Sequence, residues 1–243
     1  MAFTAFNIRL DNGCETKAGT PLFNDGPLWS SVRRCLNVLF PQGVTGLRIA
    51  DLACLEGGYA VEFARMGFGE VLGIEVREEN FANCLTVKNG LSLSNLQFVR
   101  DDVWNIEGYG QFDVIFCGGI LYHLDKPKRF LELLSRCVRK AVLINTHFST
   151  TEPIAKYALS DLDENEGLLG RWFAEPSDPH PWASWGNARS FWILREHLIQ
   201  AIRDAGFPMV FEEYDLLGGD IATALISGCY KTENRNLFVG VKV

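Results

Sequence analysis

The chain has 243 residues, 47% of them hydrophobic, so it can bury a substantial core without disulfides or a structural metal. Its formal net charge of −7 makes nucleic acid an unlikely partner, because nucleic-acid binders usually gather Lys and Arg on one face. Seven scattered cysteines, no apolar run long enough for a membrane helix and no signal-peptide core predict a reduced, cytoplasmic protein.

The order of apolar and amphipathic stretches predicts an α/β doubly wound fold with helices on both faces of the sheet. An amphipathic stretch at residues 28–40, stopped by Pro41 and Gly43, predicts a first helix that caps the sheet or the pocket. Short apolar runs then alternate with amphipathic stretches, as in a parallel sheet covered by helices. Predicted strands are 47–53, 70–75, 96–101, 112–117 and 141–146; predicted helices are 59–66, 78–90 and 126–138.

The last third of the chain follows a different pattern. Residues 148–189 contain several Pro and a concentration of Trp, and they are long for a plain connection in a compact domain. We expect a lid or a substrate-binding insertion there. A helix is predicted at 190–205, ending at Gly206, and two strands at 208–214 and 237–243, joined by a segment that contains Gly218, Gly219 and Gly228.

The most informative motif is a buried strand that runs through a turn into a helix, Arg-Ile-Ala-Asp-Leu-Ala-Cys-Leu-Glu-Gly-Gly-Tyr at residues 48–59. Such a turn exposes backbone N–H groups to an anionic or carboxylate-bearing ligand, and glycine permits a close contact. The segment resembles the first motif of class I S-adenosylmethionine-dependent methyltransferases. Asp51 matches the acidic position and Gly57 the last glycine, whereas Ala53 and Leu55 replace the two earlier glycines.

Acidic residues follow the next two predicted strands in the order that this family uses. Glu75 ends the second strand about 20 residues after the turn, where a carboxylate can accept both ribose hydroxyls of an adenosine ligand. The resemblance implies an acidic side chain on the adenine amino group after the third strand, where position favours Asp102 over Asp101. It implies S-adenosyl-L-methionine as cofactor, bound by Asp51, Ala53, Gly57, Glu75, Val76, Asp102, Val103 and Cys117.

The fourth predicted strand carries the most family-specific segment, Phe-Asp-Val-Ile-Phe-Cys-Gly-Gly-Ile-Leu-Tyr-His-Leu at residues 112–124. It resembles the Phe-Asp-x-Val…Leu-Tyr-His segment of small-molecule methyltransferases and of enzymes that modify the tRNA wobble uridine. In that family the residue at Cys117 offers a backbone carbonyl to the cofactor, and Tyr122 and His123 lie at the pocket floor. The two closing strands extend the resemblance and imply a Rossmann-like seven-stranded sheet, mostly parallel, with a C-terminal antiparallel hairpin strand.

We therefore expect a single methyltransferase domain over residues 1–243, built from four parts. These are an N-terminal helical cap at 1–45, a cofactor-binding half at 46–147, a lid or substrate insertion at 148–189, and a C-terminal helix with closing strands at 190–243.

Acid–base chemistry is needed only if the methyl acceptor must lose a proton, because in-line displacement depends mostly on alignment. For a hydroxyl acceptor, His123 is the first candidate base and His147 the second, since both follow strands at the carboxyl edge. A metal-assisted mechanism would need carboxylates after the fourth and fifth strands, where the chain has Cys117-Gly118 and Asn145-Thr146. We predict no metal.

The insertion is rich in aromatic residues, which suit a lid over an acceptor, stacking on a nucleobase, or simple packing on the sheet. Arg171 and Asn187 are further candidates for holding an anionic or hydroxylated acceptor. The predicted acceptor-binding residues are Tyr122, Trp172, Trp185 and Arg189.

Four functions stay open at this point. The first is a small-molecule methyltransferase acting on oxygen, indicated by the acidic balance, the aromatic insertion and Tyr122-His123. The second is a tRNA-modifying methyl or carboxymethyl transferase, indicated by the same Leu-Tyr-His segment. The third is a catalytically silent methyltransferase-like binding protein, indicated by Ala53 and Leu55. A nicotinamide oxidoreductase comes last, because the first strand is not followed by Gly-x-Gly-x-x-Gly.

Overall fold

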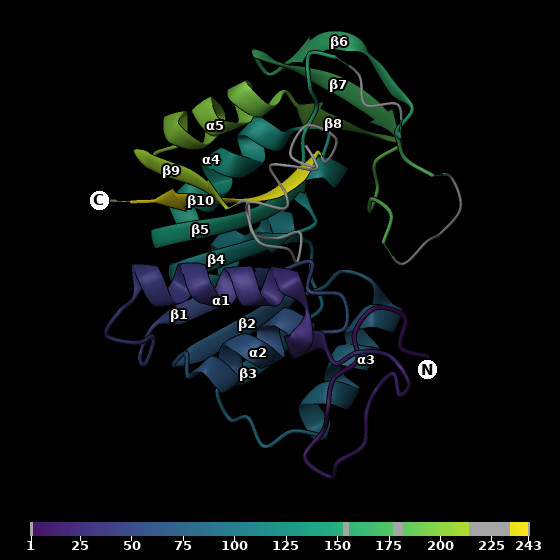
Figure 1. Cartoon of the computed structure of the whole chain (residues 1–243), viewed down its shortest axis with the longest axis vertical. Helices are drawn as coiled ribbons and strands as arrows, with labels where there is room; N and C mark the ends of the chain where they lie inside the picture. The colour runs from purple at the N-terminus through teal and green to yellow at the C-terminus, as the bar shows by residue number, and fades with distance from the viewer. Residues whose placement is uncertain (1, 153–155, 177–181, 214–233, 243) are drawn as a thin grey trace, which may run out of the picture.

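The fold is built on a seven-stranded sheet, whose strands are labelled in Figure 1. The computed structural model describes residues 2–152, 156–176, 182–213 and 234–242. The strand order is β3-β2-β1-β4-β5-β10-β9, and β10 runs antiparallel to both of its neighbours. The strands are β1 (Arg48–Leu52), β2 (Glu70–Ile74), β3 (Leu96–Val99), β4 (Phe112–Gly118), β5 (Val138–His147), β9 (Met209–Glu213) and β10 (Arg235–Val241).

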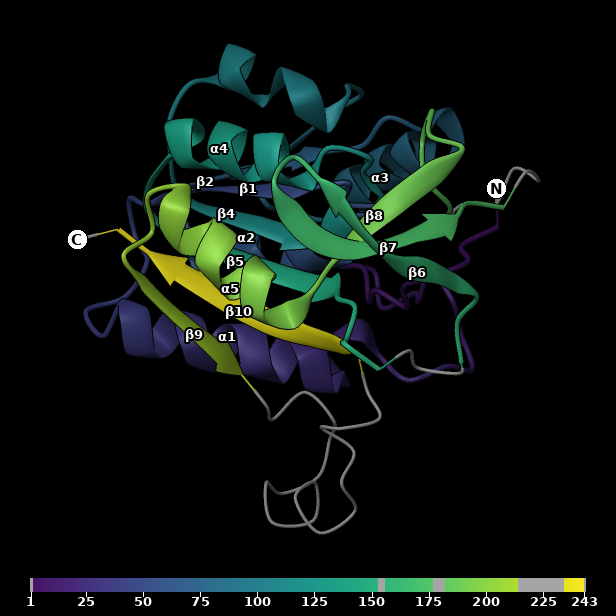
Figure 2. The same cartoon turned by 90° about the horizontal axis from the view of Figure 1, so that it is seen from above.

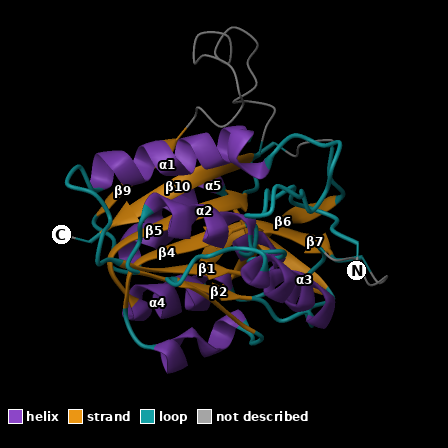
Figure 3. Cartoon of the chain, turned by 90° about the horizontal axis from the view of Figure 1, so that it is seen from below, coloured by secondary structure: helices purple, strands orange, loops and turns teal. Residues whose placement is uncertain are grey.

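Helices cover both faces of this sheet (Figure 3). One apolar cluster joins the sheet to α1 (Pro27–Leu39), α2 (Gly58–Met66) and α3 (Glu78–Asn89). The other joins it to α4 (Pro127–Cys137), α5 (Arg195–Asp204) and the 3-10 helix η2 (Val103–Tyr109). Ile49 belongs to the first cluster, whereas Ala50 and Leu52 belong to the second. Successive strand residues point to opposite faces, so short continuous apolar runs suit a sheet buried on both sides.

A second, three-stranded antiparallel sheet lies beside the carboxyl ends of the parallel strands (Figure 2). It consists of β6 (Leu159–Asn165), β7 (Leu168–Ala174) and β8 (Arg189–Ile193). The backbone N–H of Phe191 donates to the carbonyl of Leu124 at 2.9 Å, and Ser149 forms a bridge with Leu194. Strand β8 and the residue after it are therefore joined by backbone contacts to the segments that follow β4 and β5.

The predicted doubly wound fold is confirmed, and the strands and helices of residues 46–147 lie within a few residues of their predicted bounds. The predicted helix at 190–205 is wrong at its start. Residues 189–193 form β8, which pairs with β7 so that Phe191 lies opposite Trp172, and the helix begins only at Arg195. Aromatic and β-branched side chains favour a strand when a neighbouring strand is available to pair with.

Parts of the predicted C-terminal region, namely Tyr214, Val243 and the glycines at 218, 219 and 228, lie outside the described residues. Two further short 3-10 helices are η1 (Phe23–Asp25) and η3 (Leu121–His123). Among the described residues, no helix has both the length and the apolar character needed to cross a membrane.

Candidate functional site

A cavity opens at the carboxyl edge of the sheet, where segments from four parts of the chain meet. The turns after β1, β2 and β4 form its floor, and the N-terminal segment, the insertion and the start of β10 form its walls. Ligands of open α/β sheets bind at this edge because the loops there diverge. The lining residues are Phe6, Leu28, Ala53, Leu55, Tyr59, Glu75, Val76, Arg77, Gly118, Gly119, Ile120, Tyr122, His123, Asn145, Trp182, Ala183, Trp185 and Arg235.

The turn after β1 keeps a left-handed backbone at all three of its key positions. Gly57 has φ of 82°, and the two residues that replace glycines, Ala53 and Leu55, have φ of 53° and 51°. Non-glycine residues rarely adopt this conformation, which costs about 1 kcal/mol or more at each position. The turn thus keeps the backbone conformation typical of glycine although Ala53 and Leu55 carry side chains. Both residues line the cavity.

Asp51 holds this turn from below rather than lining the cavity. Its buried carboxylate accepts a hydrogen bond from the backbone N–H of Ala60 at 3.0 Å, which ties the end of β1 to the first turn of α2. Burial raises the pKa of Asp51 well above its ordinary value, and the nearby Glu75 carboxylate adds to this effect.

Glu75 lies on the cavity floor with only 2% of its surface exposed. One carboxylate oxygen accepts the backbone N–H of Leu55 at 2.9 Å, and the other accepts the N–H of Arg77 at 2.8 Å. Burial raises the pKa of Glu75, although these two hydrogen bonds act in the opposite direction. Each oxygen retains a second lone pair, so the carboxylate is held in place and can still accept hydroxyl groups.

Val76 also lines the cavity, whereas the other residues predicted to bind the cofactor, namely Gly57, Asp102, Val103 and Cys117, do not. Asp102 caps η2, accepting the backbone N–H of Trp104 at 3.0 Å, and Val103 is buried behind it. Asp101 is engaged locally, because it accepts hydrogen bonds from Tyr109 and Asn105. Cys117 is fully buried in β4, one residue before Gly118, which does line the cavity.

His123 forms a close pair with a carboxylate from the insertion. Its Nδ1 lies 2.9 Å from Oε1 of Glu175, whose side chain is 2% exposed. Burial by itself would raise the pKa of Glu175, but the hydrogen bond and the charge of His123 lower it below its ordinary value. An ionised Glu175 places the Nδ1 proton between the pair, so Nε2 is the nitrogen that can accept a proton in a ring that lines the cavity.

Sequence reasoning missed Glu175, because 52 residues separate it from His123. The only available signal was its place among the aromatic residues of the insertion. Nearby residues fix the pair: the backbone N–H of Ser184 donates to Glu175, and the side chains of Ser184 and Asn187 donate to the carbonyl of His123.

His147, the second predicted base, has a different environment. Its ring stacks on Trp192 at 4.7 Å between centroids, and its Nδ1 lies 3.2 Å from the side-chain oxygen of Asn234. Burial, aided by the charge of Arg235, lowers the pKa of His147 to about 4. It is absent from the cavity lining. A histidine with so low a pKa is a weak base at neutral pH.

A cation contributed by β10 was also missed by sequence reasoning. The Arg235 guanidinium lies 5.3 Å from the Tyr122 ring centroid, and its Nε donates to the side-chain oxygen of Asn145 at 2.8 Å. All three side chains line the cavity. Burial raises the pKa of Tyr122, so its hydroxyl stays protonated at neutral pH. This wall of the cavity is polar, whereas Phe6, Leu28 and Tyr59 form an apolar wall.

The predicted acceptor-binding residues of the insertion divide into two groups. Trp185 lines the cavity, where the Arg77 guanidinium lies 5.2 Å from its ring and also donates to the carbonyl of Ser184. Trp172 and Arg189 instead stack on each other at 3.9 Å on the small sheet and do not line the cavity.

The side chain of Arg171, a further candidate, donates to three backbone carbonyls and thereby holds the insertion together. The described residues contain no cluster of three His, Cys, Asp or Glu side chains that could hold a metal.

The chain is similar in sequence to known methyltransferases. Residues 49–141 match the family model described as "Methyltransferase domain". The chain is 28% identical over 129 residues to a tRNA U34 carboxymethyltransferase from Campylobacter lari, covering 51% of this chain and 44% of that protein. It is 27% identical over 105 residues to the mitochondrial ubiquinone biosynthesis O-methyltransferase of Dictyostelium discoideum, covering 39% and 32%. The chain thus spans less than half the length of these curated relatives.

Solved structures share the fold over nearly the whole chain. The N-terminal domain of EvdMO1, crystallised with S-adenosylhomocysteine (SAH) and D-fucose, has a TM-score of 0.72 at 23% identity, covering 98% of this chain and 90% of that one. CalS10, an amino pentose methyltransferase from Micromonospora echinaspora, has a TM-score of 0.56 at 16% identity, with 93% of each chain covered.

Proposed function

We propose that this chain, whose residues 49–141 match the methyltransferase domain model, transfers a methyl group from S-adenosylmethionine to an oxygen of a small molecule. The observation that carries the oxygen assignment is the pairing of His123, which lines the cavity, with Glu175. A hydroxyl must lose its proton on methylation, and a histidine oriented by a carboxylate is suited to accept that proton.

The residues of the cavity fit the proposed cofactor. The Glu75 carboxylate is fixed by two backbone N–H groups and retains lone pairs for ribose hydroxyls. Val76 and Ile120 offer apolar surface for an adenine ring, and the turn through Ala53 and Leu55 approaches the remainder of the ligand. When bound, this cofactor supplies an electrophilic methyl group on a sulfonium.

The chain contributes alignment, proton removal and exclusion of water. Glu175 holds Nδ1 of His123, so that Nε2 accepts the proton of the acceptor hydroxyl and Glu175 stabilises the resulting imidazolium. Trp182 and Trp185 cover the cavity from the insertion, which we propose acts as a lid. The left-handed turn at Ala53 and Leu55 argues against a silent homologue, because these substitutions leave the glycine-type backbone intact.

The small-molecule assignment receives support from the neighbour crystallised with D-fucose and from the amino pentose methyltransferase. A hydroxylated, sugar-like acceptor also suits a cavity with one aromatic wall and one wall made of Tyr122, Asn145 and Arg235.

The test measures SAH formation with a panel of hydroxylated metabolites and sugars. Replacing either member of the pair, His123→Gln or Glu175→Gln, should lower kcat by about 10²-fold or more and leave SAH affinity unchanged. His197→Gln is the matched control, because His197 lies on α5, outside the cavity lining, and accepts a backbone N–H of β7. If both pair variants keep wild-type kcat, the proposed base is wrong.

A second candidate is transfer to the wobble uridine of tRNA, the activity named for the Campylobacter relatives. The specific observation in its favour is Arg235, a cavity cation that would pair with the carboxylate of a carboxymethyl group. Turnover with tRNA but with no metabolite of the panel would favour this candidate. Failure to retain tRNA at low salt, where phosphate contacts are strongest, would count against it.

A further inference from the structure

The turn after β1 contains a carboxylate, Glu56, that is not part of the cavity lining. Glu56 has no exposed surface. Its Oε1 accepts the backbone N–H of Thr4 at 2.6 Å, and its Oε2 accepts the N–H groups of Ala5 at 3.1 Å and Phe6 at 3.0 Å. The Thr4 hydroxyl, at 3.2 Å, and the Asn83 amide, at 3.4 Å, also donate to Oε1. Three consecutive peptide groups of the N-terminus therefore bind one side chain of the turn.

The N–H groups of residues 4–6 bind the Glu56 carboxylate as backbone N–H groups bind an anion in other proteins. Among the described residues, no Lys, Arg or His forms an ion pair with Glu56. A buried carboxylate is costly unless hydrogen bonds replace its lost hydration, and here backbone N–H groups supply most of them. Removing Glu56 would in turn leave three N–H groups of residues 4–6 without acceptors.

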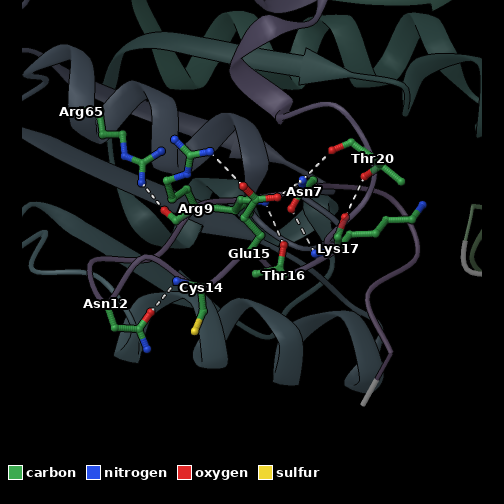
Figure 4. Close-up of polar contacts among 10 residues, drawn as sticks. Asn7, Arg9, Asn12, Cys14, Glu15, Thr16, Lys17, Thr20 and Arg65 are labelled. Atoms are coloured by element: carbon green, nitrogen blue, oxygen red, sulfur yellow. Dashed lines mark hydrogen bonds and ion pairs between the residues drawn. The ribbon is translucent and has the colours of Figure 1, made fainter.

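Glu56 holds residues 2–20, which we call the N-terminal hook. Hydrogen bonds connect residues within this segment (Figure 4). Asn7 and Arg9 both donate to the Glu15 carboxylate, and the Thr16 hydroxyl accepts the N–H of Ile8 and donates to the carbonyl of Phe6. These bonds fold the hook back on itself, so it docks as a unit.

Hydrogen bonds away from Glu56 also attach the hook to the domain. Arg65, in the last turn of α2, donates to the carbonyl of Arg9 at 2.7 Å (Figure 4). Asp11 contacts the loop after α3, donating its N–H to the carbonyl of Gly90 and accepting the N–H of Ser92. Both of these contacts lie on surface residues, whereas the Glu56 clamp is buried next to the cavity.

Docking places Phe6 in the wall of the cavity. Its ring packs edge-on against Phe23 at 4.7 Å and Tyr59 at 6.0 Å. Contact with the start of α2 is tight, because a Cβ added to Gly58 would lie 2.8 Å from the Phe6 ring. Phe6 therefore reaches the cavity only while the hook is docked.

The same turn links the hook to the ligand-binding carboxylate. Glu56 binds the hook, and the neighbouring Leu55 donates its N–H to Glu75. Leu55 also has the strained left-handed conformation that shapes the turn. Release of the hook would free one side of a turn whose other side is held by Glu75.

We propose that Glu56 is a positioning residue that makes the N-terminal hook a wall of the methyl-donor site, so that hook docking and donor affinity are coupled. This inference rests on the proposed function, since it assumes that the cavity takes S-adenosylmethionine. Phe6 is the hook residue that contacts the cavity, and Glu56 keeps it there.

The experiment compares Glu56→Gln with wild type in two assays, using SAH as the probe. Limited trypsin cleavage at Arg9 and Lys17 reports hook release, and calorimetry reports SAH affinity. The amide of Gln presents a donor to the N–H groups of the hook, so we expect cleavage at least tenfold faster. We also expect SAH affinity at least tenfold weaker, which corresponds to about 1.4 kcal/mol.

The matched control is Asp113→Asn. Asp113 is a buried carboxylate that accepts the backbone N–H of Arg48 at 3.0 Å. It lies near the amino end of β4, whereas the cavity lies at the carboxyl ends of the parallel strands. This variant should change neither cleavage of the hook nor SAH affinity. Phe6→Ala should weaken SAH binding while the hook stays protected, and Phe6→Leu should restore binding; this pair keeps the test available if Glu56→Gln fails to fold.

Three results would overturn the clamp, the coupling or the proposed function. Wild type that binds SAH, together with a Glu56→Gln hook as resistant as wild type, overturns the clamp. A released hook with SAH affinity within twofold of wild type overturns the coupling. Wild type that fails to bind SAH overturns the proposed function itself, which distinguishes that failure from the other two.

Discussion

The cofactor-binding half, residues 46–147, and the insertion at 148–189 meet at one cavity but are specified in different ways. In the first, parallel strands and left-handed turns fix the backbone around Glu75. In the second, side chains make the decisive contacts: Arg171 binds three carbonyls, and Glu175 binds His123 across 52 residues. The first region thus holds Glu75 through backbone groups, and the second holds Glu175 against His123 through a contact between side chains.

We expect the largest loss of stability from a change in the turn after β1, because its backbone conformation and packing leave no room for an added side chain. Gly57→Ala introduces a Cβ at φ of 82° that would lie 2.5 Å from the Phe98 ring, so we expect a loss of about 2–4 kcal/mol from strain plus overpacking. Gly67→Ala is the control, because Gly67 has φ of 98° but open space around it, and it should cost only about 1 kcal/mol. Equal losses in denaturant unfolding would show that packing against Phe98 is unimportant.

The next effect concerns the contact between the large sheet and the small one, where His147 of β5 stacks on Trp192 of β8. The native pKa of His147 is about 4, below its ordinary value of 6.5. Between these values the unfolded chain binds a proton that the native chain does not, so stability is lost as the pH falls from about 6.5 to 4. The loss attributable to this group is at most about 3 kcal/mol.

His147→Phe keeps the stacking and removes the titration. Unfolding measured from pH 7 to pH 4 should show wild type losing stability relative to this variant as the pH falls. Parallel pH profiles for the two proteins would mean that His147 is freely protonated in the native state.

The smallest effect probes the strain retained in the turn. Ala53→Gly removes a Cβ from a residue with φ of 53°, and we expect a gain of up to about 1 kcal/mol, partly offset by the greater freedom of glycine in the unfolded chain. Gly13→Ala makes the opposite change at a left-handed position with open space, and it should destabilise. A loss of stability in Ala53→Gly would mean that the alanine methyl packs usefully.

The two regions also differ in what the sequence predicts. The strands of residues 46–147 follow from local apolar runs, and Glu75 follows from its spacing after the turn, because parallel strands bring their ends to one edge. The pairing of β7 with β8 and the contact of Glu175 with His123 depend on residues far apart in the chain, which no local pattern reports. For that reason β8 was predicted as helix, and Trp172 and Arg189 were predicted at a cavity that they do not line.

The contact between the hook and Glu56 could not be predicted from the sequence either. Glu56 lies inside the motif that identified the turn, yet its partners are the peptide groups of residues 4–6, about 50 positions earlier. Peptide groups carry no sequence signal, so the contact emerges only from the fold. Arg235 was missed for a similar reason, because only the order of β5 and β10 in the sheet brings it to the cavity.

We propose that this cavity binds S-adenosylmethionine through Glu75, a claim that calorimetry with SAH can test without knowledge of the acceptor. The matched control for Glu75→Ala is Glu70→Ala, since Glu70 begins the same strand at the opposite edge and pairs with Arg48. We predict micromolar binding by wild type and by Glu70→Ala, and at least tenfold weaker binding, about 1.4 kcal/mol, by Glu75→Ala. Absence of binding to wild type, or equal binding by Glu75→Ala, would contradict the claim.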